Sequence, residues 1–581
     1  MNSINLCNTA DTPFSGWLRT TSDRLPLIPA NRALRWPDGT IGVPGRAITQ
    51  DGVRIIDVRV GRLAKNSMRQ LPIDRASMID WQIGALPADP LDYFGLPYID
   101  GHLMQVADVR VDGAAYTARL IGRGGPYGAL LVSLWCRWYP DRAGLLCSGR
   151  VTCSGAGVAA VPAGTLTFQW VRQTATIEHP AMADGQSETF ASLRGAHAVG
   201  ADPWPSMEPG GYEEPLLPHP QQHYLTTPAG EIPLGIAANS GVTGAQEDQV
   251  FVARDTAHPV AAAVRARAAL RHAYRPCHHL ERSGALVVPG SPSHANLILW
   301  DGRRHWVSPD PLYTSAQITP EQAGGWWGPD VEHWLLNSLA VAWRQTGDPV
   351  HQDELRTQAA VYLGQWTVQR GWSTSQPYAA RARGWEGHGA ALLHDNLEDR
   401  DLAQSVQVRW LARWGTILRA SCEAAEWDVR TDDPRLGPGR WWMPWQESVA
   451  VYGIYRAGLR FGAADACRMA AAQAGRIVDE AWREVGGRWL SAPVLPCDAG
   501  DSTPDATNAH SWACHDAGLQ PADRFTDGAF DGFDETFNGF GMPLAVAVCL
   551  LADPTHAKAR AIWDYLQEHH SDSTWLPPEV R

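Results

Sequence analysis

The period of the hydrophobic pattern changes along the chain. Up to about residue 200, short runs such as "RIIDVRVGRL", "YTARLIG" and "ALLVSLWCRWY" alternate apolar and polar residues and are separated by Gly, Pro and Asp. A period of two places one face of each run on a core, and strands at such short intervals are typical of an antiparallel sandwich. We therefore predict a β-sandwich domain over residues 1–200.

Residues 201–329 show no sustained period and are rich in proline and glycine, as in "ADPWPSMEPGGYEEPLLPHPQQ". One helical stretch, "PVAAAVRARAALRHAY", and one hairpin, "ANLILWDGRRHWVSP", interrupt them, and Asp301 and Gly302 supply the hairpin turn. Long loops in compact proteins are usually functional or wrap a neighbouring surface. We predict an irregular connecting and wrapping segment here.

From residue 330 to 581 the pattern is helical and comes in four pairs. The first pair is "DVEHWLLNSLAVAWRQTGDP" and "VHQDELRTQAAVYLGQW", and the last ends in "HAKARAIWDYLQEHH". The first member of each pair is apolar on most sides, whereas the second is amphipathic. An inner helix has neighbours all round and an outer helix faces water on one side, so the alternation predicts an (α/α) toroid. A linear solenoid of helix hairpins is the alternative.

Composition and charge exclude some classes of binding partner. The net charge is -13 and no run of Lys or Arg occurs, so the basic surface that nucleic acid requires is missing. The longest apolar stretch, "PLAVAVCLLA", is shorter than the roughly 20 residues that span a bilayer. The N-terminal residues have neither a basic nor an apolar region, so we expect no secretory signal and a cytoplasmic or virion protein.

The ten cysteines are scattered singly and form no CxxC pair, which favours reduced thiols over a disulfide framework. Tryptophan is over-represented, with 27 residues of which 18 follow residue 325. A flat aromatic ring covers the apolar face of a sugar, so the excess favours carbohydrate contact, although we expect most of these rings to pack between helices. The candidates for substrate binding are Trp334, Trp385 and Trp445.

The first helix carries a polar edge. At 100° per residue, His333, Asn337 and Arg344 lie within about 40° of one another, and Glu332 adjoins them. On an inner helix such an edge would face a central funnel, where ligands bind. The alternative is an ordinary helix start in which Asp330 caps the helix and a neighbour satisfies His333.

A strand-rich region followed by "DVEHWLLNSLAVAWRQTGDP" and "RARGWEGHGAALL" resembles the exo-rhamnogalacturonan lyase-like polysaccharide lyases. The resemblance covers the helical region by its motifs and the strand region by architecture alone. It implies a β-rich part ahead of an (α/α) toroid, and a polysaccharide as partner. The identity of the sugar is not carried over.

A lyase acting on an acidic sugar needs a group that neutralises the carboxylate, a base for the α-proton and an acid for the leaving oxygen. We expect His333 to be the base, and His388, seven residues after Arg381 on one helical face, to be the second candidate. The acid is Tyr452 or Tyr455. Candidates for neutralising or binding the substrate are Arg381, Arg383, Asn337 and Arg344.

Two acidic loops keep other interpretations open. The loop "PCDAGDSTPDATNAHSWACHDAG" holds weak metal-ligand candidates, namely Asp498, Asp501, Asp505 and His510. Neither zinc spacing nor a twelve-residue calcium loop is matched, so we predict no metal and leave the cofactor open. A second loop, "TDGAFDGFDETFNG", holds carboxylates that would suit a glycoside hydrolase, although turn formation and capping explain most of them.

Three functions follow from these patterns. The first is an enzyme that depolymerises a bacterial surface polysaccharide by β-elimination, carried on a phage particle or acting inside a bacterium. The second is a non-catalytic virion structural or receptor-binding protein, with other virion proteins as partners, because a fold does not by itself fix a function. The third is a glycoside hydrolase with paired carboxylates.

Overall fold

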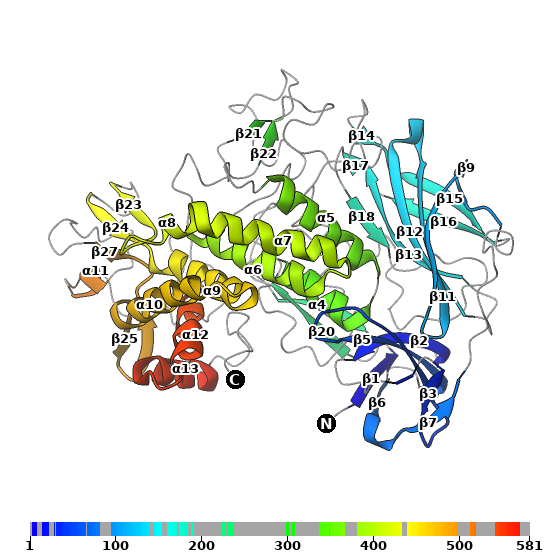
Figure 1. The fold of residues 1–581 in the computed structure, drawn as a ribbon, viewed down its shortest axis with the longest axis horizontal. Helices are drawn as coiled ribbons and strands as arrows, with labels where there is room; N and C mark the ends of the chain where they lie inside the picture. The colour runs from blue at the N-terminus through cyan, green and yellow to red at the C-terminus, as the bar shows by residue number, and fades with distance from the viewer. Residues whose placement is uncertain are drawn as a thin grey trace.

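The fold is described from a computed structural model. It describes residues 3–8, 14–22, 28–29, 31–64, 67–81, 95–139, 145–153, 160–170, 173–179, 182–183, 187–190, 222–227, 230–236, 298–300, 305–307, 336–347, 349–365, 380–432, 438–497, 512–516, 518 and 541–569. Strands fill the N-terminal region and helices the C-terminal region, and the two regions lie side by side (Figure 1). The predicted class, antiparallel sheets followed by helices, is confirmed. The predicted boundaries near residues 200 and 329 lie outside the described residues.

The described strands pair antiparallel throughout. One five-stranded sheet has the order β2 (Phe14–Ser22), β5 (Arg54–Leu63), β4 (Ile41–Ala47), β3 (Arg32–Arg35), β7 (Ser77–Asp80). The other has the order β10 (Gln105–Asp112), β11 (Ala115–Gly124), β12 (Leu130–Trp138), β13 (Leu145–Cys153), β18 (Ser187–Phe190). A four-stranded sheet has the order β16 (Gln173–His179), β15 (Gly164–Trp170), β8 (Tyr98–Ile99), β9 (His102–Leu103).

Shorter ladders complete the strands. They are β1 (Ser3–Asn8) with β6 (Ser67–Pro72), β14 (Ala160–Val161) with β17 (Met182–Ala183), β19 (Gln222–Thr227) with β20 (Gly230–Ile236), β21 (Ile298–Trp300) with β22 (His305–Val307), β23 (Val429–Thr431) and β24 (Arg440–Trp442) with β27 (Leu495–Pro496), and β25 (Trp482–Val485) with β26 (Arg488–Ser491). The pairing of β21 with β22 confirms the strands of the predicted hairpin. The helix predicted within residues 259–274 lies outside the described residues.

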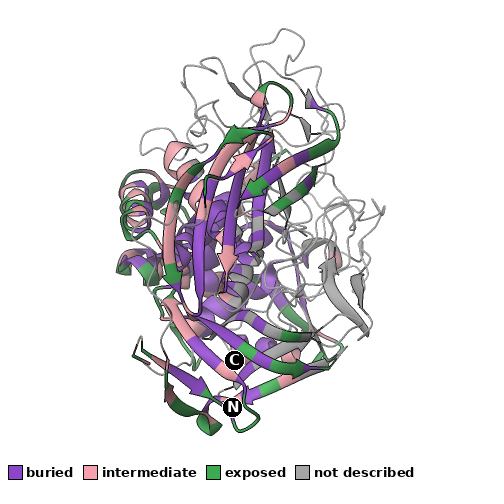
Figure 2. Ribbon diagram, turned by 90° about the vertical axis from the view of Figure 1, so that its right-hand side faces the viewer, coloured by how far each residue is buried: buried purple, intermediate pink, exposed green. Residues whose placement is uncertain are grey.

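Strand β12 shows why the second sheet forms. Its alternate residues Leu130, Val132, Leu134 and Cys136 are buried in a core that Leu166 and Phe168 of β15 share. Ser133 and Trp135, which lie between them, are buried as well, because they contact Asp353 of helix α5 (Pro349–Gln365). Both faces of this strand are therefore covered, and Figure 2 shows the long central strands largely in the buried colour.

All four predicted helix pairs are present. They are α4 (Asn337–Thr346) with α5 (Pro349–Gln365), α6 (Ala380–Asn396) with α7 (Arg400–Arg413), α9 (Pro444–Phe461) with α10 (Ala464–Ala481), and α12 (Met542–Ala552) with α13 (Ala557–His569). A π-helical turn (Trp414–Leu418) extends α7 into the short α8 (Arg419–Ser421), and α11 (Trp512–Asp516) is also short. Pro349 starts α5, and Gly347, with φ 59°, ends α4.

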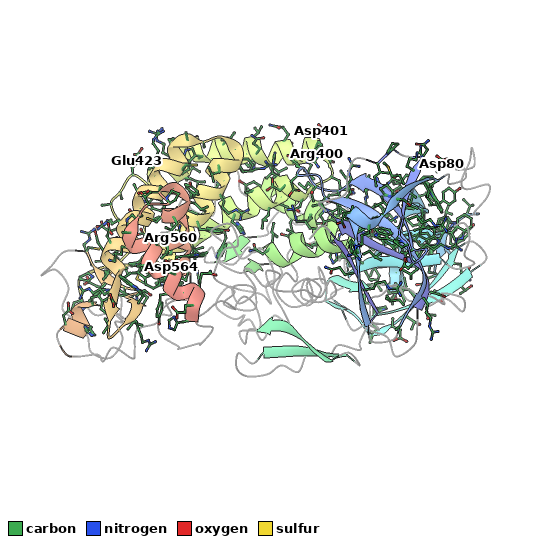
Figure 3. All side chains as sticks on the ribbon, turned by 90° about the horizontal axis from the view of Figure 1, so that it is seen from below. Asp80, Arg400, Asp401, Glu423, Arg560 and Asp564 are labelled. Atoms are coloured by element: carbon green, nitrogen blue, oxygen red, sulfur yellow. The ribbon has the colours of Figure 1, made fainter. Side chains whose placement is uncertain are left out.

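Burial alternates within most of these pairs, as predicted. Helices α6, α9 and α12 are buried on nearly all sides, whereas α7, α10 and α13 bury one face. Arg400 and Asp401 of α7, with Glu423 beyond α8, mark the exposed outer side (Figure 3). Trp343, Trp385, Trp410 and Trp482 belong to the apolar core of the helical region and have no exposed surface. Packing between helices, the role expected for most tryptophans, holds for Trp410, whose ring centroid lies 5.5 Å from that of Phe461 on α9.

Helix α5 differs from the predicted outer helix. Its residues His351–Leu355 are buried, because the charged face lies against the second sheet rather than against water. Asp353 accepts hydrogen bonds from Ser133 Oγ at 3.0 Å and Trp135 Nε1 at 2.7 Å, and it pairs with Arg119 at 3.0 Å. Glu354 pairs with Arg150. These partners come from strands, so the ion pairs fix the helical region to the sheet.

Helices α6 and α9 run parallel and touch through their backbones. Contacts pair Arg381 with Trp445 near the starts of the helices and His394 with Arg460 near their ends. Between these points, a Cβ atom added at Gly453 would overlap the carbonyl group of Gly384, and one added at Gly387 would lie 2.6 Å from Gly453 O. The contact therefore requires positions without a side chain.

In the parts of the chain that the structure describes, no helix has the length and apolar character needed to cross a membrane.

We predict that Gly453→Ala lowers the free energy of unfolding by about 3 kcal/mol or more, because the added methyl group forces α6 and α9 apart. Denaturant unfolding followed by circular dichroism measures this loss. Gly475→Ala in α10 is the matched control: an added Cβ there meets nothing within 4 Å, and alanine favours a helix by about 0.5–1 kcal/mol. Equal effects of the two substitutions would contradict the proposed backbone contact.

Candidate functional site

Three of the predicted site residues meet where α4, α6 and α9 lie together. His388 Nε2 of α6 is 2.7 Å from Asn337 Oδ1 of α4. The imidazole centroid lies 5.4 Å from the ring centroid of Tyr452 on α9. Arg456, one turn further along α9, donates a hydrogen bond from Nη1 to Tyr452 Oη at 2.8 Å. We call these four residues the polar cluster.

The protonation of His388 follows from its surroundings. Burial lowers the pKa of His388 well below its usual value, and the nearby positive charge of Arg456 lowers it further. The imidazole is therefore neutral near pH 7. Because the amide oxygen of Asn337 only accepts hydrogen bonds, Nε2 carries the proton and Nδ1 carries the lone pair. A neutral imidazole in this tautomer is suited to accept a proton at Nδ1.

The positive charge of Arg456 affects the pKa of Tyr452. Burial raises the pKa of the Tyr452 phenol, while the guanidinium of Arg456 opposes that rise through its charge and its hydrogen bond. The same guanidinium lies 5.6 Å from the centroid of the Tyr452 ring. The phenol is therefore protonated near pH 7, and a phenolate formed by proton donation would lie beside a cation.

A buried ion pair holds α6 in place close to His388 along the helix. Arg413 of α7 donates two hydrogen bonds to the carboxylate of Glu386, at 2.5 Å and 2.9 Å, and Tyr362 Oη of α5 donates a third at 3.2 Å. Glu386 precedes His388 by two residues on α6. Removing one partner of such a pair leaves an uncompensated buried charge, so this contact strongly favours a single position for α6.

Glu447 in the first turn of α9 holds a neighbouring loop. It accepts hydrogen bonds from the backbone nitrogens of Trp427 and Asp428 at 2.5 Å and 2.7 Å, and from Gln473 Nε2 at 2.5 Å. Burial raises the pKa of Glu447 to about 8. Asp428 in turn accepts a hydrogen bond from the first backbone nitrogen of α6. These carboxylates position the starts of α6 and α9.

The other predicted residues have different surroundings. Arg344 pairs with Asp51 of the turn between β4 and β5, and Arg383 donates to the backbone oxygen of Trp427 at 2.7 Å. Arg381 lies over the ring of Trp445 at 5.2 Å. Trp385 is fully buried and meets His388 edge-on, with 6.1 Å between ring centroids. Tyr455 lies near Cys467 of α10, whose Sγ donates a hydrogen bond to the Tyr455 backbone oxygen at 3.7 Å.

Several predicted residues fall outside the description of the structure. His333, the preferred base, and Trp334 precede the described start of α4, and Asp498, Asp501, Asp505 and His510 lie within residues 498–511. The carboxylates of residues 519–540 are likewise outside. Within the described residues, no three His, Cys, Asp or Glu side chains gather as a metal site.

Sequence reasoning missed Arg456, although a signal for it was present. Arg456 follows Tyr452 by four residues in "VAVYGIYRAG", and residues at this spacing lie next to each other on a helix. The partners Glu386 and Arg413 carry no such local signal, because they belong to different helices.

Comparisons of the chain with known protein families, with curated proteins and with solved structures find no match.

We predict that the stability of the protein falls as the pH drops below 6.5, in part because of His388. Below this pH the unfolded chain binds a proton at this residue, whereas the folded protein keeps it neutral because its pKa is lowered. One such group contributes a slope of up to about 1.4 kcal/mol per pH unit. Denaturant unfolding between pH 7.5 and pH 5 measures the slope for wild type and for His388→Gln.

A smaller slope in His388→Gln than in wild type is the expected result. His569→Gln is the control, since His569 lies exposed at the end of α13. Identical slopes in wild type and His388→Gln would mean that His388 is protonated equally in both states.

Proposed function

We propose that the protein depolymerises an acidic polysaccharide by β-elimination, with the polar cluster as its catalytic centre. The observation that carries the proposal is the meeting of Asn337, His388 and Tyr452, with Arg456 on the phenol. An amide, a neutral imidazole and a phenol beside a cation supply the three parts that elimination requires: carboxylate neutralisation, a base and an acid.

Each residue takes one role in this proposal. His388 Nδ1 accepts the proton next to the sugar carboxylate, so the second-ranked base becomes the first. The Asn337 amide donates to that carboxylate and favours the charge that develops on it as the proton leaves. Tyr452 gives its proton to the leaving glycosidic oxygen, and Arg456 stabilises the resulting phenolate. Carbon–oxygen cleavage then leaves a double bond in the sugar and needs no water.

The arrangement of the helices supports this class of fold. Parallel, largely buried α6 and α9, each followed by an antiparallel partner helix, are the units from which an (α/α) toroid is built. We propose that α4 and α12 continue the inner ring of such a toroid and that the two five-stranded sheets belong to a sandwich. The resemblance to exo-rhamnogalacturonan lyase-like enzymes points to the same architecture. A bacterial surface polysaccharide as substrate and a phage particle as carrier complete the proposal.

We predict that wild-type protein, incubated with a panel of acidic bacterial polysaccharides, produces the ultraviolet absorbance of a conjugated double bond. His388→Ala and Tyr452→Phe should each lower the rate by about 100-fold or more, as expected for loss of a general base or acid. Tyr455→Phe is matched to Tyr452→Phe, because it removes the same atom from the same helix one turn away, and it should keep the wild-type rate.

The opposite ranking of the two tyrosine variants would assign the acid to Tyr455. Reducing ends without absorbance would move the activity to hydrolysis, which needs a pair of carboxylates instead of this cluster. Full activity of both His388→Ala and Tyr452→Phe would overturn the proposed site.

The burial of the cluster favours a second candidate function. Tyr452 is fully buried and His388 is 1% exposed. The cluster would therefore also serve to hold three helices together. A non-catalytic virion structural or receptor-binding protein would use it in this way. No product from any polysaccharide, together with a lower melting temperature of Tyr452→Phe, would favour this function. Detection of the protein in purified virions would test whether it is a virion component.

A further inference from the structure

Two cysteines face each other across neighbouring strands of the second sheet. Cys136 of β12 and Cys147 of β13 are direct partners in the antiparallel ladder, and their Sγ atoms lie 3.2 Å apart. Both side chains are 2% exposed and belong to the same apolar core. Directly opposed residues of antiparallel strands have Cα atoms about 4.5–5.5 Å apart, which lies within the range that a disulfide requires. The backbone therefore needs no rearrangement to accommodate a bond.

We propose that Cys136 and Cys147 form a cross-strand disulfide when the chain folds in the presence of a small-molecule disulfide such as oxidised glutathione. The remaining cysteines stay reduced. The proposal therefore departs from the expectation of reduced thiols at this pair alone.

The reaction is a two-step thiol–disulfide exchange. The thiolate of one cysteine attacks a sulfur of oxidised glutathione, whose S–S bond breaks, and one glutathione leaves as a thiolate that takes up a proton. The second cysteine loses its proton and attacks the protein sulfur of this mixed disulfide, which releases the second glutathione. Two protein thiols are oxidised to one disulfide, and one glutathione disulfide is reduced to two thiols.

The surroundings of the pair determine when the bond forms. Burial raises the pKa of the Cys136 thiol, and the neighbouring Cys147 raises it further, so little thiolate exists in the folded protein. The exchange therefore takes place during folding, before the two thiols become buried in the core. Once formed, the bond lies in the core, where reductants do not reach it.

The bond would act on the contact between the sheet and the helices. Ser133 and Arg150 are ladder partners on the same two strands, and they bind Asp353 and Glu354 of α5. A one-residue slip of β12 against β13 would turn every side chain to the opposite face. A covalent link between Cys136 and Cys147 excludes such a slip and holds Ser133 and Arg150 in register for α5.

The test is refolding of the full chain from denaturant, with and without a glutathione redox buffer, on material that regains its starting circular dichroism. Thiols are counted in denaturant, and unreduced digests are analysed by mass spectrometry. We expect ten thiols to fall to eight and a peptide to link Cys136 with Cys147, two hydrogens lighter than the separate peptides. The oxidised protein should melt at a higher temperature than the reduced protein.

Two variants separate this pair from other cysteines. Cys136→Ala should keep all nine of its thiols after oxidative refolding and show no rise in melting temperature, whereas Cys422→Ala, which removes another buried cysteine, should keep seven. Ten free thiols in oxidatively refolded wild type, or links that join Cys136 or Cys147 to other cysteines, would overturn the proposal.

Discussion

The backbone contact between α6 and α9 is the constraint on which the polar cluster depends. Gly384, Gly387 and Gly453 occupy positions where a side chain would collide with the facing helix. His388 directly follows one of these glycines, and Tyr452 directly precedes another. The distance between the helices therefore sets the 5.4 Å separation of the two rings, and a wider spacing would separate the imidazole from the phenol. The absence of side chains at three positions thus determines the geometry of the side chains next to them.

Buried acidic side chains then fix the helix positions that the glycines allow. The pair of Glu386 with Arg413 holds α6 against α7, and Glu447 ties the start of α9 to the loop that precedes it. Asp353 holds α5 against the sheet. A buried acidic group is unfavourable unless its hydrogen-bond partners are in place, so alternative packings of the helices lose these partners and are disfavoured. Such a framework keeps the rings of the polar cluster in one orientation.

The sequence predicts elements better than it predicts their neighbours. Helix pairs follow from period and from end signals such as Gly347 and Pro349, and strands follow from alternation. Asn337, His388 and Tyr452 could each be placed on a helical face, but their meeting depends on contacts across more than 50 residues of chain, which periodicity does not contain. The charged face of α5 misled the prediction for the same reason: its partners Arg119 and Arg150 lie on strands more than 200 residues earlier.

The position of Arg456 favours the proposed catalytic role of the polar cluster over a purely structural one. A phenol and an amide would suffice to join helices by neutral hydrogen bonds, and an apolar pair would do so at lower cost. A partly buried guanidinium on the phenol oxygen adds a desolvation cost, and it lowers the pKa of His388 as well. A negative charge on the phenol oxygen, formed when the phenol gives up its proton, would be attracted to this cation. Burial, assisted by the same cation, keeps the imidazole neutral and able to accept a proton. One arginine therefore favours both the proton donor and the proton acceptor that β-elimination requires.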